Sequence, residues 1–367
     1  MRINKILIFS LFFLVGCIRF KYDNLSAGLV SKIPFGEKIN TIEFVPVNNV
    51  ITNLPVTVPV SSEYLFVVDY YKSMVKVFDY KGNLEKLISN QSSKLDDVDQ
   101  IKVKFGSIGI ILPGENDEVY IENKNIDKGI IEKTPETDPY ASFSGSFSPN
   151  RLRNSNSVIM QIDLKQGVKN IIGKDGTDST PFDVVEKMFL LDDNALAVLH
   201  LTDDVLTLSI FQNGKLLKTL NNDTIKPLSE NESGIDTVLD TIIPHISGSY
   251  SLFSYRYYDK NKHRFKFRRI FNYNHKTGES VLLKEIQDPS EVLFAVKDDS
   301  DFYIWETESD SSSIRLQVHD KTGYHYNNKR IFLDPPRAQW RETYTDSEDN
   351  LYSLRIKSGY LEIYRWN

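Results

Sequence analysis

Residues 64–88 read YLFVVDYYKSMVKVFDYKGNLEKLI, and this stretch decides the fold class. It contains three short apolar runs separated by turn-forming residues, which is the pattern of antiparallel strands joined by tight turns. The predicted strands are Tyr64–Asp69, Met74–Asp79 and Leu84–Ile88, and a turn containing Gly82 joins the last two. We therefore predict a β-meander as the basic unit of the chain.

The second hairpin of this unit recurs along the chain. Each copy has an apolar strand, a glycine-containing turn and a further strand, and the turn glycines are Gly82, Gly167, Gly214, Gly278 and Gly323. Repeats of about 40–50 residues with four strands each are typical of propeller blades. We predict an all-β fold, a six-bladed β-propeller of four-stranded antiparallel blades. The predicted blades span 50–90, 98–176, 181–222, 236–286, 288–333 and 336–367.

The last predicted blade contains only three strands and lacks an outer one. Residues 38–45, KINTIEFV, read as a strand without a partner nearby in the sequence. We expect this N-terminal strand to complete the last blade, because closing the ring removes an exposed sheet edge. The propeller would then occupy residues 35–367. Residues 122–157, rich in Pro, Ser and Asn, are predicted to be an insertion that either contacts a partner or is disordered.

The stretch from Phe66 to Gly82 resembles an NHL-type blade of six-bladed β-propellers. That family reads roughly as an apolar residue followed by V-A-D-x-x-N-x-R-V-x-V-F-x-x-x-G, and here Lys72 stands at the Asn position and Met74 at the Arg position. As a whole the chain resembles the poorly characterised propeller lipoproteins of spirochaetes. The resemblance implies a six-bladed propeller on a lipid anchor.

The first seventeen residues have the layout of a secretory signal. Arg2 and Lys5 give a basic start, residues 6–15 are almost wholly apolar, and a small residue precedes Cys17, the single cysteine. The run Leu-Val-Gly-Cys at 14–17 resembles a bacterial lipobox, which implies cleavage before Cys17 and its diacylation. The alternatives are an uncleaved anchor helix, for which the apolar run is too short, and an ordinary signal with an incidental cysteine.

We accordingly expect a signal peptide at 1–16 and a tether at 17–34 behind a lipidated Cys17. The anchor would hold the protein to a bacterial membrane. Because Ile18 is not an acidic retention residue, this resemblance favours the outer membrane, with the periplasmic and surface sides left open.

Composition limits the partners of the chain. The formal net charge is −6, so a general nucleic-acid binder is disfavoured, because such proteins need a basic surface. With one cysteine, no disulfide framework can form within the chain. We expect a membrane contact through the lipid and a protein or glycan partner.

A basic and aromatic segment between residues 256 and 269 is the predicted ligand-binding site. In a strand, Arg264, Lys266 and Arg268 would share one face and Phe265 and Phe267 the other. The alternative interpretation is a long hairpin with an apolar inner face and a solvated outer face. The candidate residues for an anionic ligand or sugar are Arg256, Tyr257, Tyr258, Arg264, Lys266 and Arg268.

No catalytic residues, metal ligands or cofactors are predicted. The histidines form no metal-binding motif, and His319 and His325, which flank a hairpin turn, are expected at the surface. The Asp-rich turns at 298–301 and 346–349 lack the spacing of a calcium loop and are interpreted as solvated turns. Nucleophile elbows, phosphate loops and dinucleotide fingerprints are also absent.

The sequence therefore favours a lipid-anchored extracytoplasmic β-propeller that acts as a binding or scaffold module. Propellers present loops around a central channel, so binding by the loop face is expected. One alternative is a metal-dependent hydrolase of the six-bladed lactonase type, which the predicted fold resembles. Another is a host-facing adhesin.

Overall fold

The structure is a computed structural model. It describes residues 22–43, 46–47, 50–51, 58–70, 72–90, 98–126, 155–173, 182–227, 234–307, 313–334, 340–346 and 350–367. The predicted signal segment and Cys17 lie outside these residues. So do residues 127–154 of the predicted insertion, whereas its two ends belong to paired strands.

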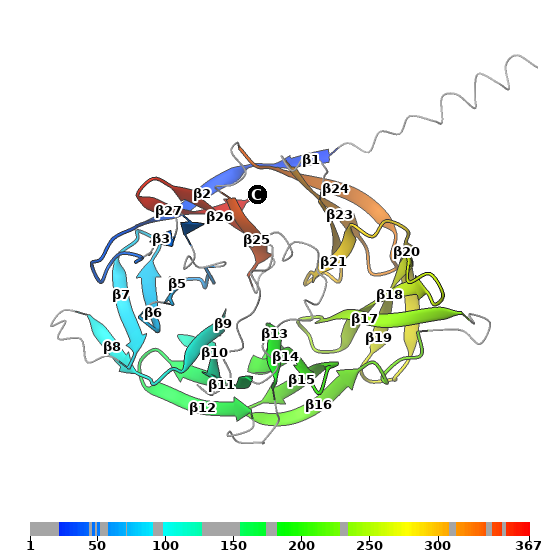
Figure 1. Ribbon diagram of the computed structural model, residues 1–367, viewed down its shortest axis with the longest axis horizontal. Helices are drawn as coiled ribbons and strands as arrows, with labels where there is room; N and C mark the ends of the chain where they lie inside the picture. The colour runs from blue at the N-terminus through cyan, green and yellow to red at the C-terminus, as the bar shows by residue number, and fades with distance from the viewer. Residues whose placement is uncertain are drawn as a thin grey trace, which may run out of the picture.

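Six sheets are arranged in a ring, and each sheet is one blade (Figure 1). Blade 1 contains β5 (Tyr64–Asp69), β6 (Met74–Asp79), β7 (Leu84–Ser89) and β8 (Asp99–Lys102). Blade 2 contains β9 (Ser107–Pro113), β10 (Glu118–Ile126), β11 (Ser155–Asp163) and β12 (Gly167–Gly173). Blade 3 contains β13 (Val184–Leu191), β14 (Ala195–Thr202), β15 (Val205–Gln212) and β16 (Lys215–Asn221), with the 3-10 turn η3 (Asp192–Asn194) between the first two strands.

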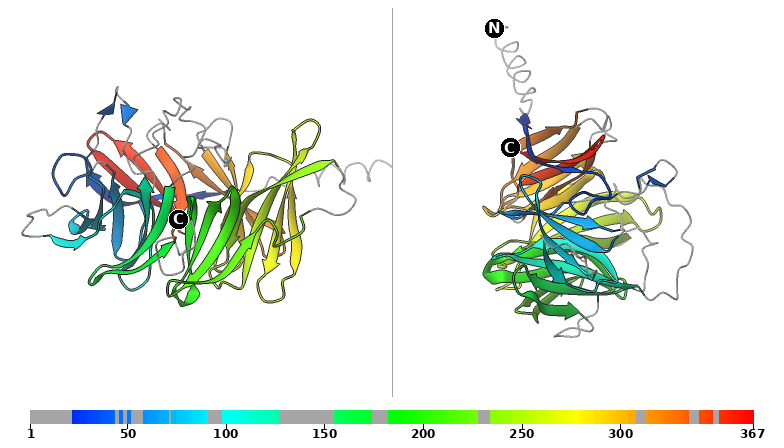
Figure 2. Two further views of the ribbon diagram at one scale, coloured as in Figure 1. Left: turned by 60° about the horizontal axis from the view of Figure 1, so that its bottom comes forward. Right: turned by 90° about the vertical axis from the view of Figure 1, so that its left-hand side faces the viewer.

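The second half of the ring follows the same plan. Blade 4 contains β17 (Ile235–Pro244), β18 (Tyr250–Asp259), β19 (Phe265–Asn274) and β20 (Ser280–Ile286). Blade 5 contains β21 (Glu291–Val296), β22 (Phe302–Thr307), β23 (Ser313–His319), β24 (His325–Phe332) and β1 (Tyr22–Leu25). Blade 6 contains β25 (Trp340–Thr345), β26 (Leu351–Lys357), β27 (Tyr360–Trp366) and β2 (Ala27–Pro34). A short hairpin of β3 (Pro46–Val47) and β4 (Val50–Ile51) stands out from one face of the ring (Figure 2).

The predicted fold class is confirmed, because the chain is an all-β six-bladed propeller closed by an N-terminal strand. The closing strand is β2, which pairs antiparallel with β27 near the C-terminus, and Figure 1 shows these two strands side by side. The expectation that residues 38–45 supply this strand is wrong. Residues 36–41 form bends and turns. The chain then folds back, so that Ile42 forms an isolated β-bridge with Phe35 and is buried.

Two blades carry an outermost strand that the sequence did not predict, the fourth strand of blade 1 and the fifth strand of blade 5. Strand β8 runs parallel to β7 on the outside of blade 1, so residues 99–102 do not belong to blade 2 as expected. Strand β1 runs parallel to β24 on the outside of blade 5. Residues 22–34 therefore form β1 and β2 of the ring. The expectation that they belong to a tether is wrong.

The hydrophobic core is divided into layers between adjacent blades. Six buried clusters each join one blade to the next, and together they run around the whole ring. In blade 1 both faces of β5 and β6 are buried, which explains why their sequences are nearly continuous apolar runs. The blades are therefore held together by side-chain packing as well as by the closing strand.

The innermost strand of each of blades 2–6 contains a β-bulge, with one more residue than the facing segment of the second strand. In blades 3, 4 and 5 the additional residues are Glu186, Asp240 and Phe294, respectively. A bulge interrupts the strict alternation of side chains and re-aims them locally. This repeated irregularity builds the site described below.

The glycine turns give a direct test of how adjacent blades meet. Gly323 and Gly359 have φ angles of 88° and 87°, but a Cβ at Gly323 would lie 2.1 Å from the Leu283 carbonyl oxygen, whereas a Cβ at Gly359 meets nothing within 4 Å. Gly359→Ala is expected to lower the free energy of unfolding by about 1–2 kcal/mol, the cost of a left-handed backbone. Gly323→Ala is expected to cost about 1–3 kcal/mol more, because blades 4 and 5 must separate.

Urea denaturation of the two alanine variants measures this difference. Gly359→Ala is the matched control, since its backbone strain is the same. Equal losses of stability in both variants would contradict the close contact between the Gly323 turn and β20.

Candidate ligand-binding site

Two of the six predicted ligand-binding residues meet in blade 4. Arg256 on β18 and Arg268 on β19 are direct cross-strand partners. They lie on the same faces of their strands as Leu252 and Ile270, which pack against blade 5. Like charges opposite each other destabilise a sheet unless a group of opposite charge intervenes.

That group is Asp240, the bulge residue of β17, which the sequence analysis did not identify. Its Oδ1 lies 3.0 Å from Arg256 Nε, and its Oδ2 lies 3.1 Å from Arg268 Nη2. Leu239 and Thr241 stay in register with Tyr255 and Ser254 on β18, so Asp240 is the extra residue between them. The sequence signal was the pair Asp240-Thr241 between apolar residues, which breaks the two-residue alternation of a strand.

The resulting cluster is buried and carries a net positive charge. The side chains of Asp240, Arg256 and Arg268 are 8%, 15% and 3% exposed. Nε and Nη1 of Arg268 are buried without a hydrogen-bond partner. Burial lowers the pKa of Arg268; Asp240 opposes this shift and Arg256 adds to it. One carboxylate therefore serves two guanidinium groups, and an anion would supply the missing acceptors.

The other four predicted residues do not join this cluster. The Tyr257 side chain is fully buried on the opposite face, where it stacks on Phe267 with ring centroids 4.6 Å apart. Tyr258 makes an edge contact with Phe265. Arg264 and Lys266 are exposed, and Arg264 precedes the first residue of β19. The structure thus brings together the part of the predicted set that faces blade 5.

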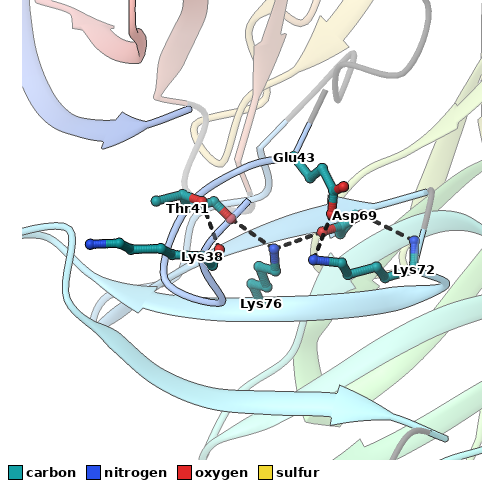
Figure 3. Close-up of polar contacts among 6 residues, drawn as sticks. All are labelled: Lys38, Thr41, Glu43, Asp69, Lys72 and Lys76. Atoms are coloured by element: carbon teal, nitrogen blue, oxygen red, sulfur yellow. Dashed lines mark hydrogen bonds and ion pairs between the residues drawn. The ribbon is translucent and has the colours of Figure 1, made fainter. Parts of the chain in front are cut away.

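In blade 1, by contrast, a buried cation is balanced by a buried carboxylate (Figure 3). Lys76 on β6 is fully buried, and its Nζ lies 2.6 Å from Asp69 Oδ2 and donates to the Thr41 carbonyl at 2.7 Å. Lys72 forms an ion pair with Glu43 beside it. Burial lowers the pKa of Lys76, and Asp69 opposes that shift. These contacts fix the segment after β2 onto the NHL-like motif, which is a structural role.

Blade 5 likewise pairs opposite charges on its second and third strands, where Arg315 contacts Glu306. In the described part of the chain, a cation lies opposite a cation on the second and third strands only in blade 4. This difference makes Arg256 and Arg268 the candidate position for an anionic ligand.

One expectation about the histidines is wrong, because His319 is fully buried. Its ring stacks between Phe302 and His325, with ring centroids 5.1 and 5.0 Å away. His319 Nδ1 is 3.2 Å from the Gly323 carbonyl, so the imidazole fastens the hairpin turn from inside. The alternation of β23 directs the residue inward, and its position next to a turn misled the sequence analysis.

Buried histidines make stability depend on pH. Burial lowers the pKa of His200, His275 and His319 to about 4, against about 6.5 in an unfolded chain. The unfolded chain therefore binds more protons, and we expect stability to fall as the pH is lowered from about 6.5 towards 4. Each histidine contributes a slope of up to about 1.4 kcal/mol per pH unit.

Urea titrations at several values from pH 7.5 to 5 measure this slope. His319→Gln should reduce the slope of stability against pH by the contribution of one histidine, up to about 1.4 kcal/mol per pH unit. His263→Gln, at an exposed position, should leave the slope unchanged. An unaltered slope in His319→Gln would show that this imidazole is not held neutral by burial.

The described residues contain neither a group of three His, Cys, Asp or Glu side chains able to hold a metal ion nor a helix long and apolar enough to cross a bilayer.

The fold places the chain among the six-bladed β-propellers, and the cluster of Asp240, Arg256 and Arg268 is buried in its fourth blade. No family model matches the chain, and no curated protein matches its sequence. Solved structures share the fold at low identity. The β-propeller domain of the Trilobed protease from Pyrococcus furiosus is 11% identical, with a TM-score of 0.45, and the match covers 85% of this chain and 80% of that one.

Two further structures are similar at this level. A hypothetical selenium-binding protein from Sulfolobus tokodaii is 9% identical, with a TM-score of 0.43 and coverage of 80% of this chain and 67% of that one. A streptogramin B lyase is 9% identical, with a TM-score of 0.39 and coverage of 84% and 92%. These likenesses concern the fold alone.

Proposed function

We propose that this protein is a lipid-anchored, extracytoplasmic binding module that takes an anionic ligand at Arg256 and Arg268 of blade 4. The observation that carries the proposal is the charge imbalance of the buried cluster. Two guanidinium groups share one carboxylate, and two N–H groups of Arg268 have no acceptor. Phosphate and carboxylate groups match the planar donor array of arginine.

The chemistry of the cluster supports binding rather than proton transfer. Arginine stays protonated in proteins, so Arg256 and Arg268 supply fixed positive charge and directed donors. Arg256 is the more exposed of the two and lies near the end of β18. A ligand would therefore reach Arg256 first and Arg268 behind it.

The anchor is proposed from the sequence, through the lipobox-like run that ends at Cys17. The ring begins at Tyr22, so four residues, 18–21, lie between the two, and an extended chain over these five Cα–Cα steps spans at most about 18 Å. Several acyl chains on Cys17 would hold the protein stably, because each buried methylene contributes about 0.8 kcal/mol. The propeller would thus sit close to the bilayer surface.

Thermal denaturation with inorganic phosphate tests the binding site. At constant ionic strength, phosphate should raise the melting temperature relative to chloride, because a ligand that binds the folded state stabilises it. Arg268→Met should abolish the rise, and Arg264→Met, on the same hairpin but exposed, should retain it. The same rise in Arg268→Met as in the wild type would refute the proposed site.

Membrane fractionation tests the anchor separately. The wild-type protein, expressed in a bacterial host with its full leader, should partition with membranes, and Cys17→Ala should be released in soluble form. A Cys17→Ala protein that remains with the membranes would rule out lipidation at this residue as the attachment.

A further inference from the structure

A second candidate site lies between blades 3 and 4, at the other end of β19 from Arg268. It is a surface pocket of about 500 Å³. Strands β15 and β16 of blade 3 form one wall, and the turns of blade 4 around Gly248 and Lys276 form the other. Its main lining side chains are Ile210, Leu217, Lys218, Ser249, His275 and Lys276.

The charge on the wall of the pocket comes from lysine. Lys218 Nζ donates to the His275 carbonyl at 3.0 Å and lies 5.5 Å from the centroid of the Tyr273 ring. No carboxylate of the described chain pairs with it. Two lysines in other blades do find one, Lys169 on the outermost strand of blade 2 with Glu118 and Lys86 on the third strand of blade 1 with Asp99.

The His275 imidazole shapes the pocket without adding charge to it. Its Nδ1 lies 2.7 Å from the Gly248 carbonyl, and its Nε2 lies 2.9 Å from Ser251 Oγ, so both ring nitrogens are occupied. Burial, and after it the charge of Lys218, lower the pKa of His275 to about 4, so the ring is neutral at pH 7. The pocket at neutral pH therefore carries two ammonium groups, Lys218 and Lys276, and no carboxylate.

The remaining wall is apolar. Of its two apolar lining side chains, Ile210 is buried and Leu217 is 60% exposed. A large aliphatic side chain left this open beside an uncompensated ammonium group offers contacts to a ligand that is charged at one end and apolar at the other.

We infer that the pocket between blades 3 and 4 binds a small organic monocarboxylate, with the carboxylate on Lys218 and the apolar part against Leu217 and Ile210. This site is separate from the proposed anion site at Arg256 and Arg268, and it takes a different ligand class. The ammonium of Lys218 provides the ion pair, and the carbonyl of His275 keeps it in place.

Titration calorimetry of the full chain with benzoate, hexanoate and benzamide tests this inference. Benzoate and hexanoate should bind saturably, and benzamide, which has the shape of benzoate without the charge, should bind at least about tenfold more weakly. Lys218→Met should weaken benzoate by about tenfold or more. Lys215→Met is the matched control, since this exposed lysine of the same strand is outside the pocket lining and should bind benzoate normally.

Leu217→Asp provides a second variant at an exposed position, where the new carboxylate should repel benzoate without disturbing the fold. Arg268→Met should leave benzoate binding intact, which separates this test from that of the proposed function. Equal affinity for benzoate and benzamide, unchanged affinity in Lys218→Met, or no saturable benzoate binding up to about 10 mM would overturn the inference.

Discussion

Asp240→Asn is expected to lower the free energy of unfolding by about 3–5 kcal/mol, the typical cost of leaving buried charges without their partner. The substitution keeps the size of the side chain but removes the negative charge of the carboxylate that contacts both Arg256 and Arg268. Both guanidinium groups would then remain buried, directly opposite each other. Urea denaturation at pH 7 measures the loss.

Arg268→Met is the informative counterpart to this substitution. It leaves Asp240 and Arg256 as a balanced pair, so stability should change by less than about 1 kcal/mol or increase, because an uncompensated buried charge is removed. Added phosphate should restore part of the stability of Asp240→Asn, since the anion replaces the missing carboxylate. A loss below about 1 kcal/mol in Asp240→Asn would show that solvent already neutralises the cluster.

Much of the fold was predictable because a propeller blade is a local structure. The strands of blade 1 follow from the alternating and continuous apolar runs of residues 64–88, and tight turns fix their order. The closing strand was misassigned because it pairs with residues more than 300 positions away. Its sequence, with Gly28 at the start and Pro34 at the end, resembles a loop, yet proline is acceptable at the end of an edge strand.

The candidate site was predictable only in part, because side-chain direction depends on register. Arg256 and Arg268 were identified from their basic and aromatic surroundings, but the register shifts between Tyr257 and Tyr258, so Arg264 and Lys266 do not extend the cluster. Asp240 enters through a bulge, and a bulge depends on pairing between strands rather than on composition. The pocket at Lys218 joins two blades and has no local signature at all.

Truncation of the chain after Lys357 is expected to abolish cooperative folding. It removes β27, which lies between β26 and β2 and is the strand through which the N-terminal segment closes the ring. Leu361 and Ile363, both fully buried, would leave the cluster that joins blade 6 to blade 1. Circular dichroism during heating should show no sigmoidal transition, and size-exclusion chromatography should show aggregates, because two sheet edges are exposed together.

Point substitutions on β27 distinguish loss of closure from loss of chain length. Ile363→Asp places a charge in the layer between blades 6 and 1 and should reproduce most of the effect of truncation. Tyr360→Asp, on the same strand but 48% exposed, should melt almost as the wild type does. Because the six inter-blade layers form one circuit, opening it at a single place also weakens the layers on either side. A truncated protein that stays monomeric and melts cooperatively would mean that the blades are stable without closure.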